Sequence, residues 1–201
     1  ISVQQEESVV NVLRSSAEET LCDLELVGDE IEFSLRFVTS NQGVPQNRIC
    51  IITEETQFMH TPVPLKGAHQ ARNCGLALAA ICKLKTLGFT FEDAALYESL
   101  GNSSIDGRME LAWDKPKILV DGAHNPSSLQ SLIKCIGAHV PYDSMVCVFG
   151  CCADKDVNGM LRELSLGADK IIFTKSHDNP RAAEPRILQR QFAEISGKMT
   201  Q

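Results

Sequence analysis

From residue 118 onward, short apolar runs alternate with longer amphipathic segments, and this alternation limits the possible folds most strongly. The apolar runs cover residues 118–121, 145–149 and 170–174. The amphipathic segments follow at about 127–137, 157–166 and 184–196. Short apolar runs bounded by turn residues are typical of buried strands, and a repeated strand–helix–strand order favours a parallel sheet with right-handed crossovers. The sequence therefore predicts an α/β unit here.

The first apolar run leads into the stretch KILVDGAHNP, residues Lys117–Pro126. Asp121 lies where the strand is expected to end, and Ser127 or Ser128 is expected to cap the next helix. Ligands of open α/β sheets bind just beyond the carboxyl ends of the strands. Asp121 and His124 are therefore candidates for polar chemistry, although a turn capped by the acid explains the same residues about equally well.

The other two apolar runs also end in polar loops. The second is followed by FGCCADKD, residues 149–156, and the third by TKSHDNPR, residues 174–181. Because parallel strands deliver their carboxyl ends to one edge of the sheet, the three loops are expected to converge. A capping role remains the simpler interpretation of any single loop residue, but the convergence favours a ligand site.

The first third of the chain has the pattern of a small antiparallel sheet. Apolar and polar residues alternate over Ile31–Phe37, the period of a half-exposed strand. Gly28-Asp29 is a hairpin signal, and Asn41–Gly43 marks a second turn before a strand at Ile49–Thr53. Before this patch, an amphipathic helix capped by Ser2 is expected to fade near residue 20.

A long helix is predicted from Gly67 to Gly88, with apolar residues on one face. His69, Gln70 and Asn73 lie near its amino terminus, and His69 and Asn73 share a face because they are four residues apart. These polar side chains either bind a ligand or are simply solvated residues of a capped helix.

A domain boundary is predicted near residues 105–116, where the composition changes. Just before it, Thr90–Asp93 has the pattern of a capping box for a shorter helix that ends at Leu100. The predicted domains are residues 1–106, a smaller α+β piece, and residues 107–201, the α/β unit. Only three strands follow the boundary and no initiator Met is present, so an excerpt from a longer chain is expected.

The composition argues against several classes of partner. The net charge of -7 and the lack of a basic block make nucleic acid an unfavourable partner. No apolar run approaches the ~18 residues of a membrane span, and no signal peptide is present, so we expect a cytoplasmic protein. Eight cysteines without a CxxC pair indicate free thiols in a reducing compartment and no zinc site.

Two nucleotide-binding motifs are missing from the sequence. Without G-x-G-x-x-G, a nicotinamide-dependent oxidoreductase lacks its phosphate turn, and that class is disfavoured. Without G-x-x-x-x-G-K-[ST], the chain has no P-loop of its own.

Four short motifs carry a resemblance to a known family. In order they are GxHQxxN at residues 67–73, GRxE at 107–110, DGAHNP at 121–126 and DKD at 154–156. Together they resemble folylpolyglutamate synthase and dihydrofolate synthase, members of the Mur ligase superfamily, over about residues 60–185. Asp178–Arg181, DNPR, is also found in Mur ligases that add diaminopimelate or lysine, so a Mur-type peptidoglycan-precursor ligase is an alternative.

The resemblance implies a fold and a reaction. Residues 1–106 would be the end of a central ATPase domain, and residues 107–201 the start of a Rossmann-like C-terminal domain. ATP phosphorylates a carboxylate of a folate or dihydropteroate, and the amine of L-glutamate attacks the acyl phosphate to give an amide, ADP and phosphate. The parent would be a monomeric enzyme of folate and one-carbon metabolism. Mg²⁺ would be needed, with its main ligands outside this chain.

The resemblance also assigns roles to particular residues. Asp121 and His124 are the catalytic candidates, with Asp121 at the ribose or the interdomain linker and His124 near the nucleotide. The adenine side of the nucleotide would be contacted by His69, Gln70 and Asn73, and its phosphates by Arg108. The incoming amino acid would be contacted by Ser176, Asp178, Asn179 and Arg181.

Because the P-loop is missing, two interpretations remain open. The chain is part of such a ligase and is inactive alone, or it is a non-catalytic nucleotide- or ligand-binding domain that has kept the fold.

Overall fold

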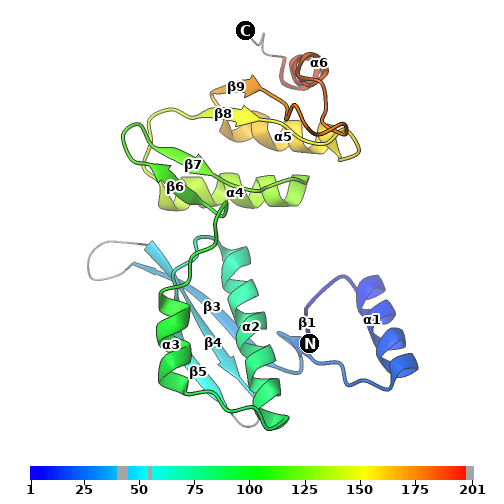
Figure 1. Ribbon diagram of the computed structural model, residues 1–201, viewed down its shortest axis with the longest axis vertical. Helices are drawn as coiled ribbons and strands as arrows, with labels where there is room; N and C mark the ends of the chain where they lie inside the picture. The colour runs from blue at the N-terminus through cyan, green and yellow to red at the C-terminus, as the bar shows by residue number, and fades with distance from the viewer. Residues whose placement is uncertain (40–44, 54–55, 198–201) are drawn as a thin grey trace. The chain divides into compact units, whose positions relative to one another are not determined.

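The computed structural model describes residues 1–39, 45–53 and 56–197. The chain divides into two compact units, Ile1–Asp106 and Gly107–Gln201, which we call the first and second unit. Each unit is mixed α/β and contains only small sheets (Figure 1). The hydrophobic clusters have all their members within one unit or the other, so each unit is described by itself.

The first unit is built on a three-stranded antiparallel sheet, in the order β3 (Glu32–Thr39), β4 (Pro45–Ile52) and β5 (Gln57–Val63). The expected antiparallel patch is therefore confirmed. Alternation along β4 buries Ile49 and Ile51 and turns the residues between them to the opposite face. The turn predicted at residues 41–43 lies outside the described residues.

One face of this sheet is covered by α2 (Ala68–Thr86), the predicted long helix. The shorter helix α3 (Asp93–Gly101) adds Leu96 and Leu100 to the same core. The capping box expected at its start is wrong, because the cap position falls on Glu92, whose side chain makes no capping hydrogen bond, and Thr90 lies two residues too early. The buried cluster comprises Val27, Ile31, Ile49, Ile51, Phe58, Val63, Ala71, Cys74, Leu78, Ala79 and Cys82.

The amino-terminal segment differs from its predicted form. Helix α1 (Glu7–Thr20) begins after Glu6, while Ser2 belongs to β1 (Ser2–Val3) and caps nothing. β1 pairs in parallel with β2 (Leu26–Val27). The predicted turn at Gly28-Asp29 forms, because the N–H groups of Asp29 and Ile31 both donate to the carbonyl of Leu26, at 3.1 Å. The hairpin itself is wrong, because β2 pairs with β1 rather than with β3.

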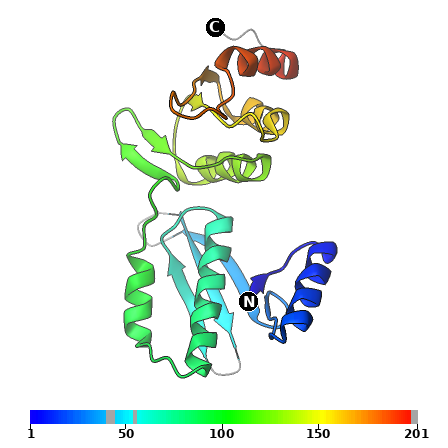
Figure 2. The same cartoon turned by 45° about the vertical axis from the view of Figure 1, so that its right-hand side comes forward.

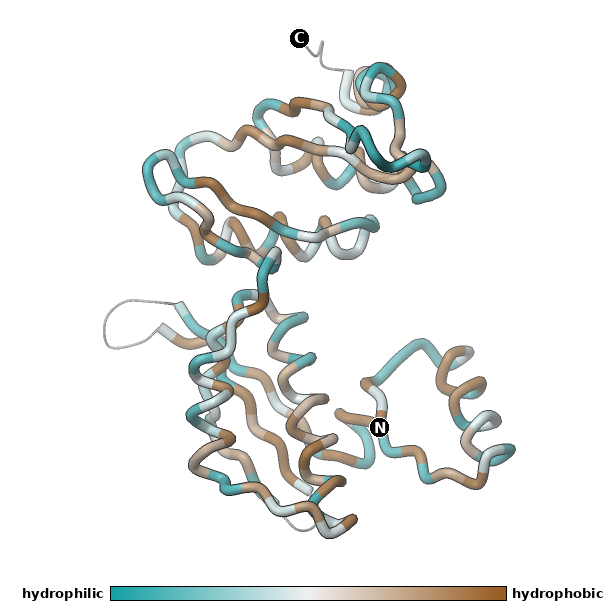
Figure 3. Tube along the Cα trace, viewed as in Figure 1, coloured by the Kyte–Doolittle hydropathy of each residue, from teal (hydrophilic) through white to brown (hydrophobic). Residues whose placement is uncertain are grey.

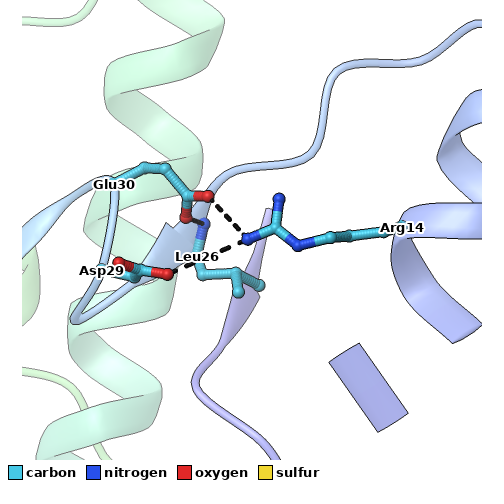
Figure 4. Close-up of polar contacts among 4 residues, drawn as sticks. All are labelled: Arg14, Leu26, Asp29 and Glu30. Carbon is cyan, nitrogen blue, oxygen red and sulfur yellow. Dashed lines mark hydrogen bonds and ion pairs between the residues drawn. The ribbon is translucent and has the colours of Figure 1, made fainter. Parts of the chain in front are cut away.

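Helix α1 buries none of its residues and is tied to the rest of the unit by polar contacts. Arg14 reaches the turn after β2, where its Nη2 atom lies 3.0 Å from Oε1 of Glu30 and 3.9 Å from Asp29 (Figure 4). The other carboxylate oxygen of Glu30 accepts the backbone N–H of Leu26 at 2.8 Å. That bond, the backbone N–H of Glu30 and the Arg14 guanidinium together lower the pKa of Glu30.

The second unit contains two separate two-stranded sheets. β6 (Glu110–Trp113) pairs antiparallel with β7 (Ile118–Val120), and β8 (Val146–Phe149) pairs in parallel with β9 (Lys170–Phe173). The three predicted strands therefore form, but the continuous three-stranded parallel sheet does not. The sequence predicts no strand before β7, but β6 forms there. β7 therefore pairs with the antiparallel β6 instead of with one of the other predicted strands.

The helices of the second unit confirm the sequence pattern. They are α4 (Pro126–His139), α5 (Val157–Gly167) and α6 (Pro185–Ser196), and α5 packs between the other two (Figure 2). Their apolar faces join Phe149 and Ile171 of the parallel pair in one cluster. The opposite face of that pair stays open, with Val146, Val148 and Ile172 exposed by 56%, 66% and 47%, and Figure 3 shows the strands as apolar runs.

All eight cysteines are free, which confirms the expectation of thiols rather than disulfides. The apolar sequence around most of them predicted burial, but the burial differs from one cysteine to another. Cys74, Cys82 and Cys135 are buried, whereas Cys22 is exposed. Burial raises the pKa of the Cys74 and Cys82 thiols. Within the described ranges, no helix combines the length and apolar character needed to cross a membrane.

Candidate functional site

The loop that follows β7 is organised by the carboxylate of Asp121. Its Oδ2 atom accepts the backbone N–H of Met109 at 2.9 Å, and its Oδ1 atom accepts that of Ala123 at 2.8 Å. A third bond runs from the N–H of Gly122 to the carbonyl of Gly107, at 2.8 Å. Asp121 thus joins two segments that are twelve residues apart, and both of its oxygens hold backbone in place.

The GRxE motif forms the bend that docks on this loop. Gly107 and Met109 both adopt positive φ, +67° and +48°, and the N–H of Gly107 donates to Oε2 of Glu110 at 2.8 Å. The exposed Arg108 side chain lies beside the loop, because a Cβ atom placed on Gly122 would be 3.2 Å from its Nη1 atom. The structure therefore places Arg108 beside the loop that Asp121 organises.

Helix α4 starts with a reciprocal cap on Asn125. The Asn125 side chain accepts the N–H of Ser128 at 2.8 Å, and the Ser128 hydroxyl accepts the N–H groups of Asn125 and His124 at 3.1 and 3.0 Å. The predicted caps, Ser127 and Ser128, are wrong because Pro126 occupies the first helical position and moves the cap to Asn125.

His124 is held by the same loop. Its ring Nδ1 lies 2.9 Å from the carbonyl oxygen of Gly122, and the ring is exposed. A donor bond from Nδ1 to this carbonyl leaves Nε2 as the free acceptor of the ring. The bond to the Gly122 carbonyl thereby fixes the orientation of the imidazole.

The three loops that follow β7, β8 and β9 meet around an open pocket of about 390 Å³. His124 represents the first loop, and Asp121 does not line the pocket. Two lysines line the pocket that the sequence did not single out as site residues. Lys155 entered only as part of the DKD motif and Lys175 was not proposed, although each lies in a loop that follows a predicted strand. The lining residues are His124, Gly150, Cys151, Cys152, Lys155, Thr174, Lys175, Ser176, Asn179 and Ala182.

The loop after β9 is fastened to the loop after β8. Asn179 accepts the N–H of Arg181 at 3.0 Å and donates to the Cys152 sulfur at 3.5 Å. The carbonyl of Arg181 accepts the N–H of Ala153 at 2.8 Å, and its exposed guanidinium lies 3.6 Å from Asp154. Of the four candidates for amino-acid binding, Ser176 and Asn179 line the pocket, while Asp178 and Arg181 do not.

The three adenine candidates lie in the first unit, in the first two turns of α2. Gln70 is only 5% exposed, and its Oε1 atom accepts a hydrogen bond from Nδ2 of Asn73 at 3.3 Å. His69 is half-buried beside them. The structure therefore pairs the two amides and leaves the exposed Asn73 with further donor and acceptor capacity.

A metal site would require several ligands in one place. Among residues 1–39, 45–53 and 56–197, no group of three or more His, Cys, Asp or Glu side chains is arranged to hold an ion. The expectation that Mg²⁺ finds its main ligands elsewhere remains a prediction.

The sequence of residues 107–200 matches the family described as Mur ligase, glutamate ligase domain. A probable bifunctional folylpolyglutamate synthase/dihydropteroate synthase of Haloferax volcanii is 28% identical over 191 residues, which cover 94% of this chain and 22% of that protein. The dihydrofolate synthase/folylpolyglutamate synthase of Bacillus subtilis is 31% identical over 147 residues, which cover 73% of this chain and 34% of that protein. The chain thus spans about a fifth to a third of these relatives.

A solved structure extends the likeness to the fold. The folylpolyglutamate synthase of Mycobacterium tuberculosis, complexed with ADP and AMPPCP, superposes with a TM-score of 0.82 at 25% sequence identity. The superposition covers 97% of this chain and 43% of that protein. The arrangement of elements in both compact units therefore has a counterpart in one known enzyme.

Proposed function

Because this chain belongs to the Mur ligase family and resembles its folylpolyglutamate and dihydrofolate synthases, we propose that it is part of an ATP-dependent ligase that joins L-glutamate to a folate or dihydropteroate. ATP activates a carboxylate of the acceptor as an acyl phosphate, and the amine of glutamate displaces phosphate to form the amide. The observation that carries the proposal is the pocket at the ends of β7, β8 and β9, inside the matched segment.

Within this ligase, the two units are assigned to different domains. Residues 1–106 form the end of the central ATPase domain, and residues 107–201 belong to the C-terminal domain, a Rossmann-like fold of which β8 and β9 supply the parallel pair. The division of the chain after Asp106 and the start of the matched segment at Gly107 support this assignment.

In this proposal, separate sets of residues are assigned to the adenine and to the phosphates of ATP. Asn73, Gln70 and His69 face the adenine, since amide groups offer both donors and acceptors to the base. Arg108 binds phosphate oxygens through its planar fork. Mg²⁺ bridges phosphate oxygens and is held mainly by residues outside this chain.

Asp121 and His124 act at the junction of nucleotide and acceptor. Asp121 holds the GRxE bend against the DGAHNP loop and so positions Arg108. His124 lines the pocket, and with Nδ1 bonded to the Gly122 carbonyl, Nε2 is the ring atom that can accept a proton or a hydrogen bond.

The loop of Ser176, Asp178, Asn179 and Arg181 receives the amino acid. Ser176 and Asn179 contact it directly in the pocket, and Lys155 and Lys175 supply positive charge for a carboxylate. Asp178 and Arg181 are exposed on the same loop but do not line the pocket, and they are proposed as further contacts of the amino acid.

The test is a steady-state assay of ADP release by the complete protein that carries this chain, with glutamate and each acceptor in turn. Arg108→Ala is expected to lower kcat/KM for ATP by the equivalent of ~1.5–3 kcal/mol, the value of hydrogen bonds to a charged group. Arg162→Ala, an exposed arginine of α5, is the control and should leave the rate unchanged. Absence of ATP- and glutamate-dependent product from the complete protein would exclude the ligase and favour the binding domain.

The 201-residue chain by itself is expected to give no ligase product, because no P-loop amides or lysine are present to stabilise the transferring phosphoryl group. Glutamate-dependent ADP release by this chain alone would contradict that expectation.

A further inference from the structure

A thiol and an imidazole face each other on the sheet of the first unit, and neither belongs to the residues assigned above. Cys50 of β4 and His60 of β5 lie with Sγ and Nδ1 3.8 Å apart. The backbone N–H of His60 also donates to the same sulfur, at 3.2 Å. Two groups of one residue therefore converge on one thiol, and Cys50 is partly exposed while His60 is exposed.

The pair depends on an irregularity in the sheet. The pairing of β4 with β5 shifts register between Ile49 and Ile51, which pair with Thr61 and Phe58. The extra residue of this bulge therefore lies on β5, in the segment that faces Cys50. His60 on the facing strand adopts a left-handed backbone with φ of +52°. Histidine, asparagine and aspartate are enriched among the non-glycine residues that accept this conformation. The bulge and the left-handed residue together direct both the N–H and the ring of His60 to the sulfur.

The surroundings of the thiol are positively charged. In the register of β3 and β4, Arg36 stands opposite Arg48, and Ser34 stands opposite Cys50. Alternation along the strands puts both arginines on the face of Cys50, opposite the buried Ile49 and Ile51. Arg48 also donates to the carbonyl of His60 at 3.5 Å.

Among the described residues of β3 and β4, Glu32 is the one acid on this face. In the register it stands opposite Ile52, two residues beyond Cys50 along β4. The described residues next to the thiol in the register are therefore cationic or neutral.

We propose that Cys50 is a reactive thiol that forms mixed disulfides with small anionic disulfides of the glutathione class. In the reaction, His60 Nδ1 takes the thiol proton and Cys50 Sγ attacks one sulfur of the small disulfide. The new S–S bond forms as the old one breaks, and the second half leaves as a thiolate. Cys50 is thereby oxidised and the small disulfide reduced. Arg36 and Arg48 attract the negative charges of the reagent.

The chain contains its own comparison thiols. Cys22 is exposed and lies in the same unit, but its sulfur donates to the carbonyl of Thr20 at 3.6 Å instead of facing an imidazole. Cys74 and Cys82 are buried, and burial disfavours their thiolates by raising the pKa of each. If exposure alone decided reactivity, Cys22 would react first, whereas a contribution from the imidazole would make Cys50 react first. Which cysteine reacts faster therefore distinguishes exposure from the imidazole as the cause.

The experiment measures the reaction of the 201-residue chain with dithiobis-nitrobenzoate, a dianionic disulfide, and with oxidised glutathione, and locates the modified cysteine by peptide mass spectrometry. Cys22→Ser and Cys50→Ser variants isolate the two rates. Cys50 is expected to react about a hundredfold faster than Cys22, the lower end of the contribution of a positioned base. Equal rates, or faster reaction at Cys22, overturn the proposal.

His60→Asn tests the role of the imidazole, because asparagine tolerates the left-handed backbone but offers no comparable base. The rate at Cys50 should fall to that of Cys22 while the circular dichroism spectrum stays the same. A second, independent variant is Arg36→Gln, which should slow the anionic reagents and leave cystamine, a cationic disulfide, unaffected. An unchanged rate in His60→Asn refutes the dyad, and equal slowing of cystamine refutes the selectivity for anions.

Discussion

Asp121 shows how one side chain can set the geometry of a site that it does not line. Its two oxygens accept backbone N–H groups from Met109 and Ala123, so the carboxylate holds two turns in register. The sequence predicted this acid as a candidate for chemistry, with a capping role as the alternative. The two hydrogen bonds fit the capping role, and no periodicity could have indicated them because Met109 is distant along the chain.

Asp121→Asn is expected to destabilise the second unit. An amide has one acceptor oxygen, so one of the two N–H bonds loses its acceptor and the other loses its charge, and the free energy of unfolding should fall by about 1–3 kcal/mol. Urea denaturation measures the change. Asp143→Asn, an exposed acid of the loop before β8, serves as the control. Equal stability of the two variants would show that the loop does not depend on Asp121.

Glu30 should make the attachment of α1 dependent on pH. The pKa of Glu30 is lowered in the folded chain from the ordinary value of 4.5, chiefly by the N–H of Leu26, so the unfolded chain binds the proton more readily. The stabilisation is therefore complete above about pH 5 and is lost as the pH falls through the folded pKa. Denaturation at about pH 6 and pH 3 should show that the free energy of unfolding changes less with pH in Glu30→Gln than in the wild type. Glu19→Gln, an exposed acid of α1, should retain the wild-type pH dependence.

At the scale of elements, the ends of β8 and β9 approach too closely for any side chain larger than hydrogen. A Cβ atom placed on Gly150 would lie 2.6 Å from the carbonyl oxygen of Thr174, and both residues line the pocket. The parallel pairing of β8 with β9 brings the two loops to one edge, and the glycine at position 150 permits this close approach.

The helices were predictable because a repeat of 3.6 residues is a local property, and α4, α5 and α6 match their expected ranges closely. Strand pairing was not predictable in the same way, because β7 pairs with β6 rather than with β8. The convergence of the three polar loops was nevertheless deduced correctly from strand order, whereas the cap at Asn125 depended on the geometry of Pro126.

Gly150→Ala is expected to destabilise the second unit by about 1–3 kcal/mol, the usual range for overpacking. The displaced strands should also reshape the pocket. Gly137→Ala is the matched control: this glycine lies inside α4, and the position that a methyl group would take has no atom within 4 Å, so the same substitution should stabilise by about 0.5–1 kcal/mol. Thermal or urea unfolding gives both values, and opposite signs for the two glycines are the expected result.

At the scale of the whole molecule, each compact unit has its own hydrophobic core, and the second unit adds a small cluster of Met109, Cys135 and Ile136. The clusters around Ile49 and around Leu161 have no member in common, and the division after Asp106 separates them. The division falls within residues 105–116, where the composition of the sequence changes, but the sequence pattern could not indicate how small the sheets are.

Denaturation of the whole chain should therefore proceed in two steps, one for each core. Asn125→Ala removes the cap of α4 and should move only the step of the second unit, by about 0.5–2 kcal/mol. Ser127→Ala, at an exposed position of the same helical turn, should move neither step. Fluorescence of Trp113 reports the second unit and circular dichroism reports both. A single coincident transition that shifts as a whole in Asn125→Ala would contradict the independence of the cores.

The open face of β8 and β9 has a consequence for handling the protein. Val146, Val148 and Ile172 form a strip of branched aliphatic groups, and within the described chain these strands pair only with each other. Such a strip, bordered by unpaired strand edges, favours self-association as the concentration rises. The concentration at which the protein begins to associate should therefore depend on these three side chains more than on the net charge of -7. Val148→Lys should raise the concentration at which light scattering begins while leaving the packed side of the sheet, and hence the unfolding midpoint, close to its original value.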